Sequence, residues 1–209
     1  LAMLEQERAL YEELRARTAR DPLAAAALHG VSTPTAVPGL GTMRSLFYNR
    51  GGCNDTTNII RGRAIYVGTR AIIWEDSANV LQSSLTPELA QMYQRLGTIF
   101  DQDQYRIVRD NFGDPLRRDP QTDNDGRIHM VFTQRLNGSG AAAYVTSCDQ
   151  YPRTAAPASN FGEFFYGFVP TSAASNLNST NNVDGWFTFM ARTVVHEVKH
   201  IASHAARVA

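Results

Sequence analysis

The sequence predicts an α+β fold, in which a mixed β-sheet combines with a few helices. Short runs of β-branched and aromatic residues, bounded by turn residues, occur in two parts of the chain, residues 44–75 and 127–169. Helical patterns separate these runs and follow the second of them. Hydrophobic residues make up 43% of the 209 residues, which is enough for a sizeable core.

The charge balance and the lengths of the apolar runs give no support to several classes of partner. The 20 basic and 20 acidic residues balance, so net charge supports neither a nucleic-acid partner nor binding to a membrane surface. No apolar run approaches the length of a membrane span, and we expect none. Because the sequence begins with Leu1, a signal peptide could have been removed. The oligomeric state is not predicted.

The N-terminal part, residues 1–41, is predicted to be an appendage to the main unit at residues 42–209. Residues 2–20 form an amphipathic helical pattern, with Leu4, Leu10 and Leu14 on one side. A segment rich in Pro and Gly at residues 30–41 then predicts a linker.

The first sheet segment is predicted to contain strands at residues 44–48, 61–67 and 71–75, the last two joined as a hairpin at Gly68-Thr69. Thr86 and Pro87 then suit the N-cap and first turn of a helix that runs to about residue 100. A separate helix is expected at about residues 102–111.

The second sheet segment is predicted to contain strands at residues 127–133, 142–146 and 163–169. Before it, Asp123-Asn124-Asp125-Gly126 looks like part of a calcium loop. Gln121 and Phe132 occupy the positions of the first and last acidic ligands of such a loop, so a tight turn is favoured. A polar loop at residues 171–184 leads into a long apolar helix.

That last helix carries His196-Glu197-Val198-Lys199-His200, an HExxH pattern. Histidines four apart lie one helical turn from each other, so both imidazoles can reach one metal ion. His196 and His200 are therefore candidate ligands of Zn²⁺, and Glu197 is the candidate general base that takes a proton from water. The alternative is a surface helix with paired histidines and an incidental Glu.

A catalytic zinc ion needs a third protein ligand. His204 lies a further turn along the same helix and would strain to reach the metal, so a supporting or surface role is favoured for it. We expect the third ligand to be a Glu on a helix beyond Ala209. Tyr144, Tyr151 and Tyr166 could donate to a transition state, but packing is the favoured role of each.

The two cysteines, Cys53 and Cys148, are too far apart in sequence to form a C-x-x-C motif. A long-range disulfide is favoured, and it indicates an oxidising compartment and hence a secreted protein. Two buried thiols, or a cysteine that masks the zinc, are the alternatives.

Several segments resemble hyicolysin-like secreted bacterial zinc metallopeptidases, and the resemblance covers about residues 44–204. The segments are residues 63–68, 72–76, 111–113, 124–133, 143–149, 159–166 and 193–201. The resemblance implies a gluzincin-type, zincin-like catalytic subdomain with an HExxH active-site helix. In it, His196 and His200 bind zinc, Glu197 is the catalytic base, and a C-terminal helical half supplies a Glu ligand.

The sequence thus predicts a secreted zinc-dependent endopeptidase that acts on peptides or proteins. An extended substrate is expected to pair with an edge strand at residues 142–146. One rival is a structural or binding protein of the same fold without a complete zinc site. The other is a zinc hydrolase that acts on another class of substrate.

Overall fold

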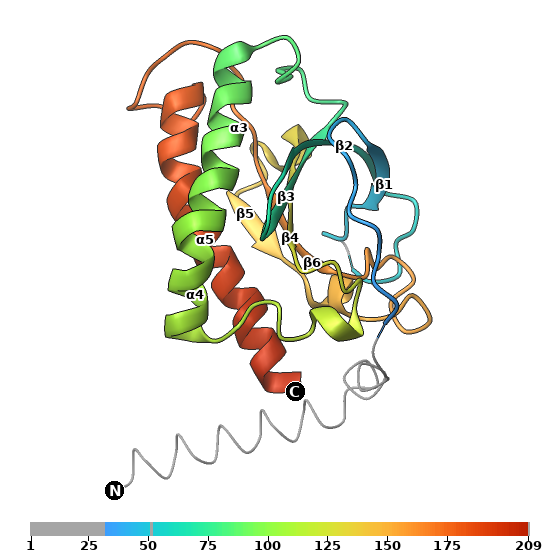
Figure 1. Ribbon diagram of the computed structural model, residues 1–209. Coiled ribbons are helices and arrows are strands. Elements are labelled where there is room, and N and C mark those ends of the chain that lie inside the picture. Colours follow the sequence, from blue (N-terminus) through green and yellow to red (C-terminus); the bar gives the residue numbers. More distant parts are fainter. Residues whose placement is uncertain (1–31, 51, 209) are drawn as a thin grey trace, which may run out of the picture.

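A six-stranded mixed sheet lies at the centre of the structure, a computed structural model that describes residues 32–50 and 52–208. Helices α3, α4 and α5 cover one face of this sheet, and β1 lies at its far edge (Figure 1). The α+β prediction is therefore confirmed. The helix predicted at residues 2–20 lies outside the described residues, whereas residues 32–39 run without regular structure into β1.

The first three strands form an antiparallel unit, and the last two of them form the predicted hairpin. They are β1 (Met43–Phe47), β2 (Ile59–Val67) and β3 (Ala71–Asp76). The backbone N–H of Gly68 donates to the carbonyl of Ala71 at 2.8 Å and closes the turn.

The other strands extend the sheet beyond β3 in the order β1-β2-β3-β4-β6-β5. Strands β4 (Ile128–Phe132) and β6 (Glu163–Gly167) are parallel to β3, and β5 (Ala143–Val145) is antiparallel to β6. Each lies within a predicted strand but is shorter. Strand β5 is consequently an edge of the sheet.

The helices predicted at about residues 86–100 and 102–111 are joined into one rod, contrary to expectation. Helix α3 (Pro87–Ile99) continues through a π-helical turn (Phe100–Gln104) into α4 (Tyr105–Phe112). No Pro or Gly interrupts the junction, and the wider turn aims Asp101 at the β2–β3 hairpin. The carboxylate of Asp101 accepts hydrogen bonds from the backbone N–H of Thr69 at 2.7 Å and of Arg70 at 2.9 Å.

Helix α5 (Val183–Val208) is 26 residues long and packs on the same face of the sheet. Its inner side is completely apolar at Met190, Val194 and Val198, each 0% exposed. These side chains share one core with Met130 of β4 and Phe165 of β6. This packing fixes the position of α5 relative to the β5 edge.

Short 3-10 helices complete the chain at Asp119–Gln121, Gln134–Leu136 and Ser147–Gln150. The predicted turn at residues 123–126 is confirmed, with positive φ angles of 52° at Asn124 and 76° at Gly126.

The predicted disulfide between Cys53 and Cys148 is present. It joins the loop between β1 and β2 to the 3-10 helix that follows β5. Within the part of the chain that the structure describes, no helix is both long enough and apolar enough to cross a membrane.

Candidate metal centre

The imidazoles of His196 and His200 project from successive turns of α5 and meet. Their Nε2 atoms are 3.1 Å apart, and their ring centroids are 4.8 Å apart. Two nitrogen ligands on a tetrahedral zinc ion, each about 2.0–2.1 Å from the metal, are themselves separated by about 3.3 Å. The pair is thus close to the spacing that one metal ion requires.

Glu197 and His200 line a pocket of about 390 Å³ between α5 and the β5 edge. Glu197 is only 8% exposed, whereas His196 is exposed and does not line this pocket. The opposite wall comprises Ala143, Tyr144, Val145 and Thr146. A carboxylate and an imidazole therefore face the same hollow.

Burial and charge alter the protonation of both groups. Burial raises the pKa of Glu197, although the neighbouring charges of His196 and Lys199 partly oppose this effect. Burial, together with the positive charges of Lys199, His196 and Arg207, lowers the pKa of His200. The second change favours the neutral imidazole, the form that binds metal.

The outer edge of β5 offers backbone groups beside this pocket. The N–H of Phe168 donates to the carbonyl of Ala142, and Tyr144 lies opposite Tyr166. By the alternation of an antiparallel ladder, the peptide groups of Ala143 and Val145 then point away from β6. An extended chain can pair with these groups.

Among the described residues, no third metal-binding side chain joins the imidazole pair. No group of three closely spaced His, Cys, Asp or Glu ligands within that part of the chain contains His196 or His200. His204 lines the pocket but packs edge-on against Tyr151, with ring centroids 5.8 Å apart.

The three tyrosines have packing roles, as the sequence favoured. Tyr151 and Tyr166 are 2% and 0% exposed, and the hydroxyl of Tyr166 donates to the carboxylate of Asp149 at 2.7 Å. The ring of Tyr144 stacks on that of Tyr166, with centroids 4.8 Å apart. Tyr166 belongs to the core cluster on the sheet face opposite α5, and Tyr144, which also lines the pocket, packs against that cluster.

Sequence reasoning missed a second constellation, which consists of buried acidic side chains around His129. It comprises Asp119, Asp123, Asp125, His129 and Glu163, whose ligand atoms form two groups of three. The only signal in the sequence was the segment Asp123-Asn124-Asp125-Gly126. Asp119 precedes this segment by four residues and Glu163 joins it from the start of β6, and no local pattern identifies either of them.

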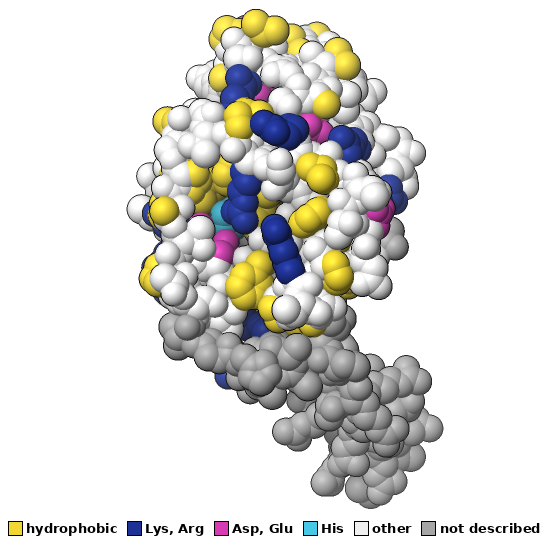
Figure 2. All heavy atoms as spheres, turned by 90° about the vertical axis from the view of Figure 1, so that its right-hand side faces the viewer, with side chains coloured by type: hydrophobic (Ala, Val, Ile, Leu, Met, Phe, Trp, Pro, Cys, Tyr) yellow, Lys and Arg dark blue, Asp and Glu magenta, His cyan; other side chains and the backbone are white. Residues whose placement is uncertain are grey.

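Basic side chains on the β1 side of the molecule do not form a comparable site. Figure 2 shows them gathered over the middle of that face, with apolar side chains between them. Arg63 forms an ion pair with Glu75 at 2.6 Å, and Arg44 lies over the ring of Phe164 at 5.5 Å. These two arginines are thus engaged within the protein itself.

No model of a known protein family matches the chain, and a search of curated protein sequences returns no match.

Proposed function

We propose that this protein is a secreted zinc-dependent endopeptidase with a zincin-like catalytic subdomain. In this proposal, His196 and His200 bind Zn²⁺ and Glu197 is the general base. The observation that carries the proposal is the 3.1 Å approach of the two imidazole nitrogens beside a pocket that contains Glu197. The resemblance to hyicolysin-like peptidases supports the same assignment.

The residues suit zinc by their chemistry. Neutral imidazoles are common zinc ligands, and the lowered pKa of His200 favours the neutral form. When bound, zinc supplies a Lewis acid that polarises a carbonyl oxygen and lowers the pKa of water to about 7. The third ligand would come from outside the described residues. In the hyicolysin-like family that the chain resembles, this ligand is a Glu.

Glu197 moves the proton in this proposal. Its carboxylate accepts a proton from the attacking water and then delivers it to the nitrogen of the departing amine. Burial in the pocket raises the pKa of this group, which makes Glu197 a better base than an exposed Glu. A zinc site with a purely structural role would need no such base.

Substrate binding follows from the open edge of β5. The outward peptide groups of Ala143 and Val145 can form a ladder with an extended peptide, which would place a peptide bond along the wall of the pocket. This arrangement favours peptides or proteins over the substrates of other zinc hydrolases. The Cys53–Cys148 disulfide is typical of an oxidising compartment and supports secretion.

Glu197→Gln tests the proposal, with Glu88→Gln as a control because Glu88 is an exposed Glu at the start of α3. We expect the full-length Glu197→Gln protein to keep its zinc and to lose several orders of magnitude in kcat/KM for peptide hydrolysis. Glu88→Gln should retain the wild-type rate. Hydrolysis by Glu197→Gln at the wild-type rate would show that the assigned base is wrong.

A further inference from the structure

Buried carboxylates converge where β4 and β6 begin. Asp119, Asp123 and Glu163 each contribute an oxygen atom, and these atoms lie within 4.8 Å of one another. The three residues are 6%, 4% and 0% exposed. The register of the sheet brings Glu163 to the turn that carries Asp119 and Asp123, because it pairs Ile128 at the start of β4 with Glu163 at the start of β6.

Hydrogen-bond donors around these oxygens are few. Asp119 accepts hydrogen bonds from the backbone N–H of Gly126, at 3.0 Å, and from that of Asp125. Both oxygens of Glu163 lie 3.1 Å from the hydroxyl of Thr122, which has only one proton to donate. Most of the oxygen lone pairs are therefore not satisfied by these donors.

Asp123 is the clearest case. Both of its carboxylate oxygens are buried and have no hydrogen-bond partner of good geometry among the described residues, although Oδ2 lies 3.0 Å from Nε2 of His129. A Cβ atom at Gly162 would lie 2.6 Å from Oδ2, so the neighbouring backbone fits closely around this carboxylate. A buried anion without partners is costly, and such groups usually pair with a cation or coordinate a metal.

Basic side chains of the described residues offset only part of this charge. The guanidinium of Arg118, which is 3% exposed, acts electrostatically on Glu163, while Asp119, Asp123, Asp125 and Glu163 are all acidic. Within the part of the chain that the structure describes, the carboxylates of this cluster therefore outnumber the basic side chains that act on them.

His129 is not a suitable ligand for a metal ion, although its Nε2 has no hydrogen-bond partner of good geometry among the described residues. The indole N–H of Trp74 donates to Nδ1 of His129 at 3.0 Å, which requires that Nδ1 carry no proton. The ring proton of the neutral imidazole then lies on Nε2, which faces Asp123 at 3.0 Å and Asp125 at 3.1 Å. The remaining ligand atoms are all oxygens.

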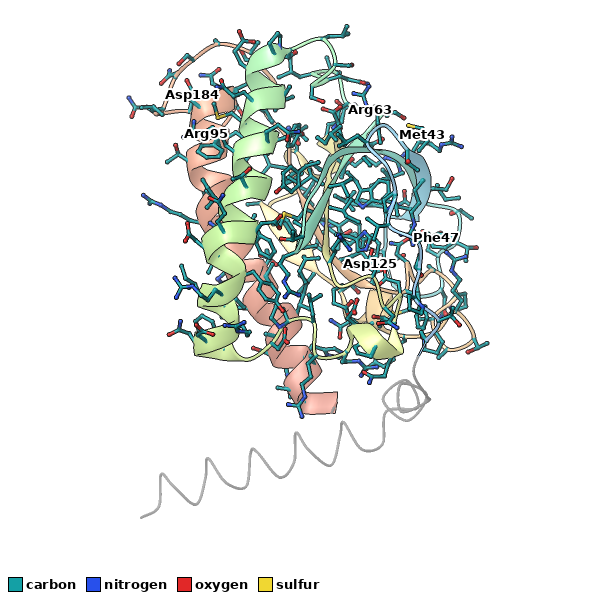
Figure 3. The ribbon with its side chains drawn as sticks, in the orientation of Figure 1. Met43, Phe47, Arg63, Arg95, Asp125 and Asp184 are labelled. Atoms are coloured by element: carbon teal, nitrogen blue, oxygen red, sulfur yellow. A yellow bond between two sulfur atoms is a disulfide. The ribbon has the colours of Figure 1, made fainter. Side chains whose placement is uncertain are left out.

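We infer that Asp119, Asp123 and Glu163 bind one Ca²⁺ ion, at a structural site separate from the proposed zinc centre. Oxygen ligands suit hard cations, and ligands 2.3–2.6 Å from a calcium ion lie at mutual separations compatible with the 4.8 Å limit found here. Mg²⁺ is less suited, because it usually retains several water molecules, which this buried site would have to accommodate. Figure 3 labels Asp125 on the sheet side of the molecule, away from Arg95 and Asp184 in the helical layer.

The ion would tie the chain together around the start of the sheet. Asn124 donates through its side chain to the carbonyl of Ser32 at 2.9 Å, and the N–H of Thr35 donates to the carbonyl of Asp123 at 2.8 Å. Calcium at Asp123 would therefore stabilise both the start of β6 and the segment that leads into β1.

The test compares thermal unfolding of the metal-free protein with and without added Ca²⁺. Asp123→Asn replaces the carboxylate with an uncharged amide of nearly the same shape. Asp103→Asn is the control, since Asp103 is an exposed Asp in the π-helical turn. We expect Ca²⁺ at 100 times its Kd to raise the Tm of the wild type and the control by on the order of 5–10 °C. Asp123→Asn should show no such rise.

Terbium supplies a second readout, because Tb³⁺ replaces Ca²⁺ and its luminescence is sensitised by a nearby indole such as Trp74. We expect sensitised emission that Ca²⁺ displaces in the wild type and in His200→Ala, and no emission in Glu163→Gln. This result would separate the site from the zinc centre. A wild-type Tm that is insensitive to Ca²⁺, or undiminished calcium binding in Asp123→Asn and Glu163→Gln, would overturn the inference.

Discussion

The imidazole pair on α5 and the carboxylate cluster at the start of β6 differ in ligand type and in access. His196 and His200 present nitrogen atoms beside an open pocket, whereas Asp119, Asp123 and Glu163 present oxygen atoms inside the protein. An open, incomplete ligand set leaves room for a substrate. A buried set of carboxylates has no access for a substrate and suits a structural ion. The proposed catalytic metal and the proposed structural metal therefore lie in different regions of the chain.

Metal exchange should separate the two regions most strongly. We expect dialysis against a chelator to lower peptide hydrolysis by the full-length protein by roughly four orders of magnitude, because the Lewis acid is lost. Zn²⁺ should restore hydrolysis, and Ca²⁺ alone should not. Recovery of activity on addition of Ca²⁺ alone to zinc-free protein would show that the assignment of the chemistry to zinc is wrong.

Removal of the disulfide tests how far the stability of the region around the pocket depends on a covalent cross-link. The bridge between Cys53 and Cys148 spans 95 residues, and Cys148 lies close to the pocket wall. The double substitution Cys53→Ser/Cys148→Ser should lower the free energy of unfolding by up to about 4–5 kcal/mol. Urea unfolding measures this loss, and an unchanged midpoint would show that the bridge contributes nothing.

Asp149 provides a buried carboxylate with a full set of donors, against which the cluster of Asp119, Asp123 and Glu163 can be compared. Asn49, Asn160 and Tyr166 all donate to it, at 3.0, 2.8 and 2.7 Å. Burial nevertheless raises its pKa from 3.8 to about 7, although these hydrogen bonds lower it in part. Because the folded pKa exceeds the unfolded one, the folded state holds an extra proton between about pH 4 and 7.

The contribution of Asp149 to stability is therefore lost as pH rises through this window, by up to about 4 kcal/mol. Asp149→Asn should remove that component, so its free energy of unfolding should depend less steeply on pH than that of the wild type. Urea unfolding from pH 4 to 8 measures the difference. Identical pH dependence in the two proteins would mean that Asp149 has the same pKa folded and unfolded.

A smaller effect is expected at the β5 edge, where the open region would bind its substrate. Val145→Pro removes the outward N–H, while Val145→Ala keeps it and serves as the control. Loss of one ladder hydrogen bond should raise KM for a peptide about fivefold, since a net hydrogen bond contributes about 1 kcal/mol. Equal KM values for the two variants would argue against strand pairing by the substrate.

Local sequence patterns predicted much of the fold. The hairpin at Gly68-Thr69, the helix start at Thr86-Pro87 and the turn at residues 123–126 each depend on neighbouring residues, and all three are confirmed. The continuous rod through residues 100–104 was not predicted, because a π-helical turn has no sequence signal of its own.

The two candidate sites show the same limit. His196 and His200 lie four residues apart on one helix, so the sequence alone places them together. Asp119 and Asp123 lie four residues apart before β4, but Glu163 comes from a distant segment and meets them only through the parallel pairing of β4 with β6. The local sequence pattern correctly predicted the turn at residues 123–126. It did not indicate the buried carboxylates that surround this turn.

The most direct test of this account is the metal content of the full-length protein after dialysis against buffer containing Zn²⁺ and Ca²⁺. Elemental analysis should find one zinc and one calcium per chain in the wild type. His200→Ala should lose only zinc, and Asp123→Asn should lose only calcium. Stoichiometric zinc in His200→Ala would contradict the proposed function, and undiminished calcium in Asp123→Asn would contradict the separate structural site.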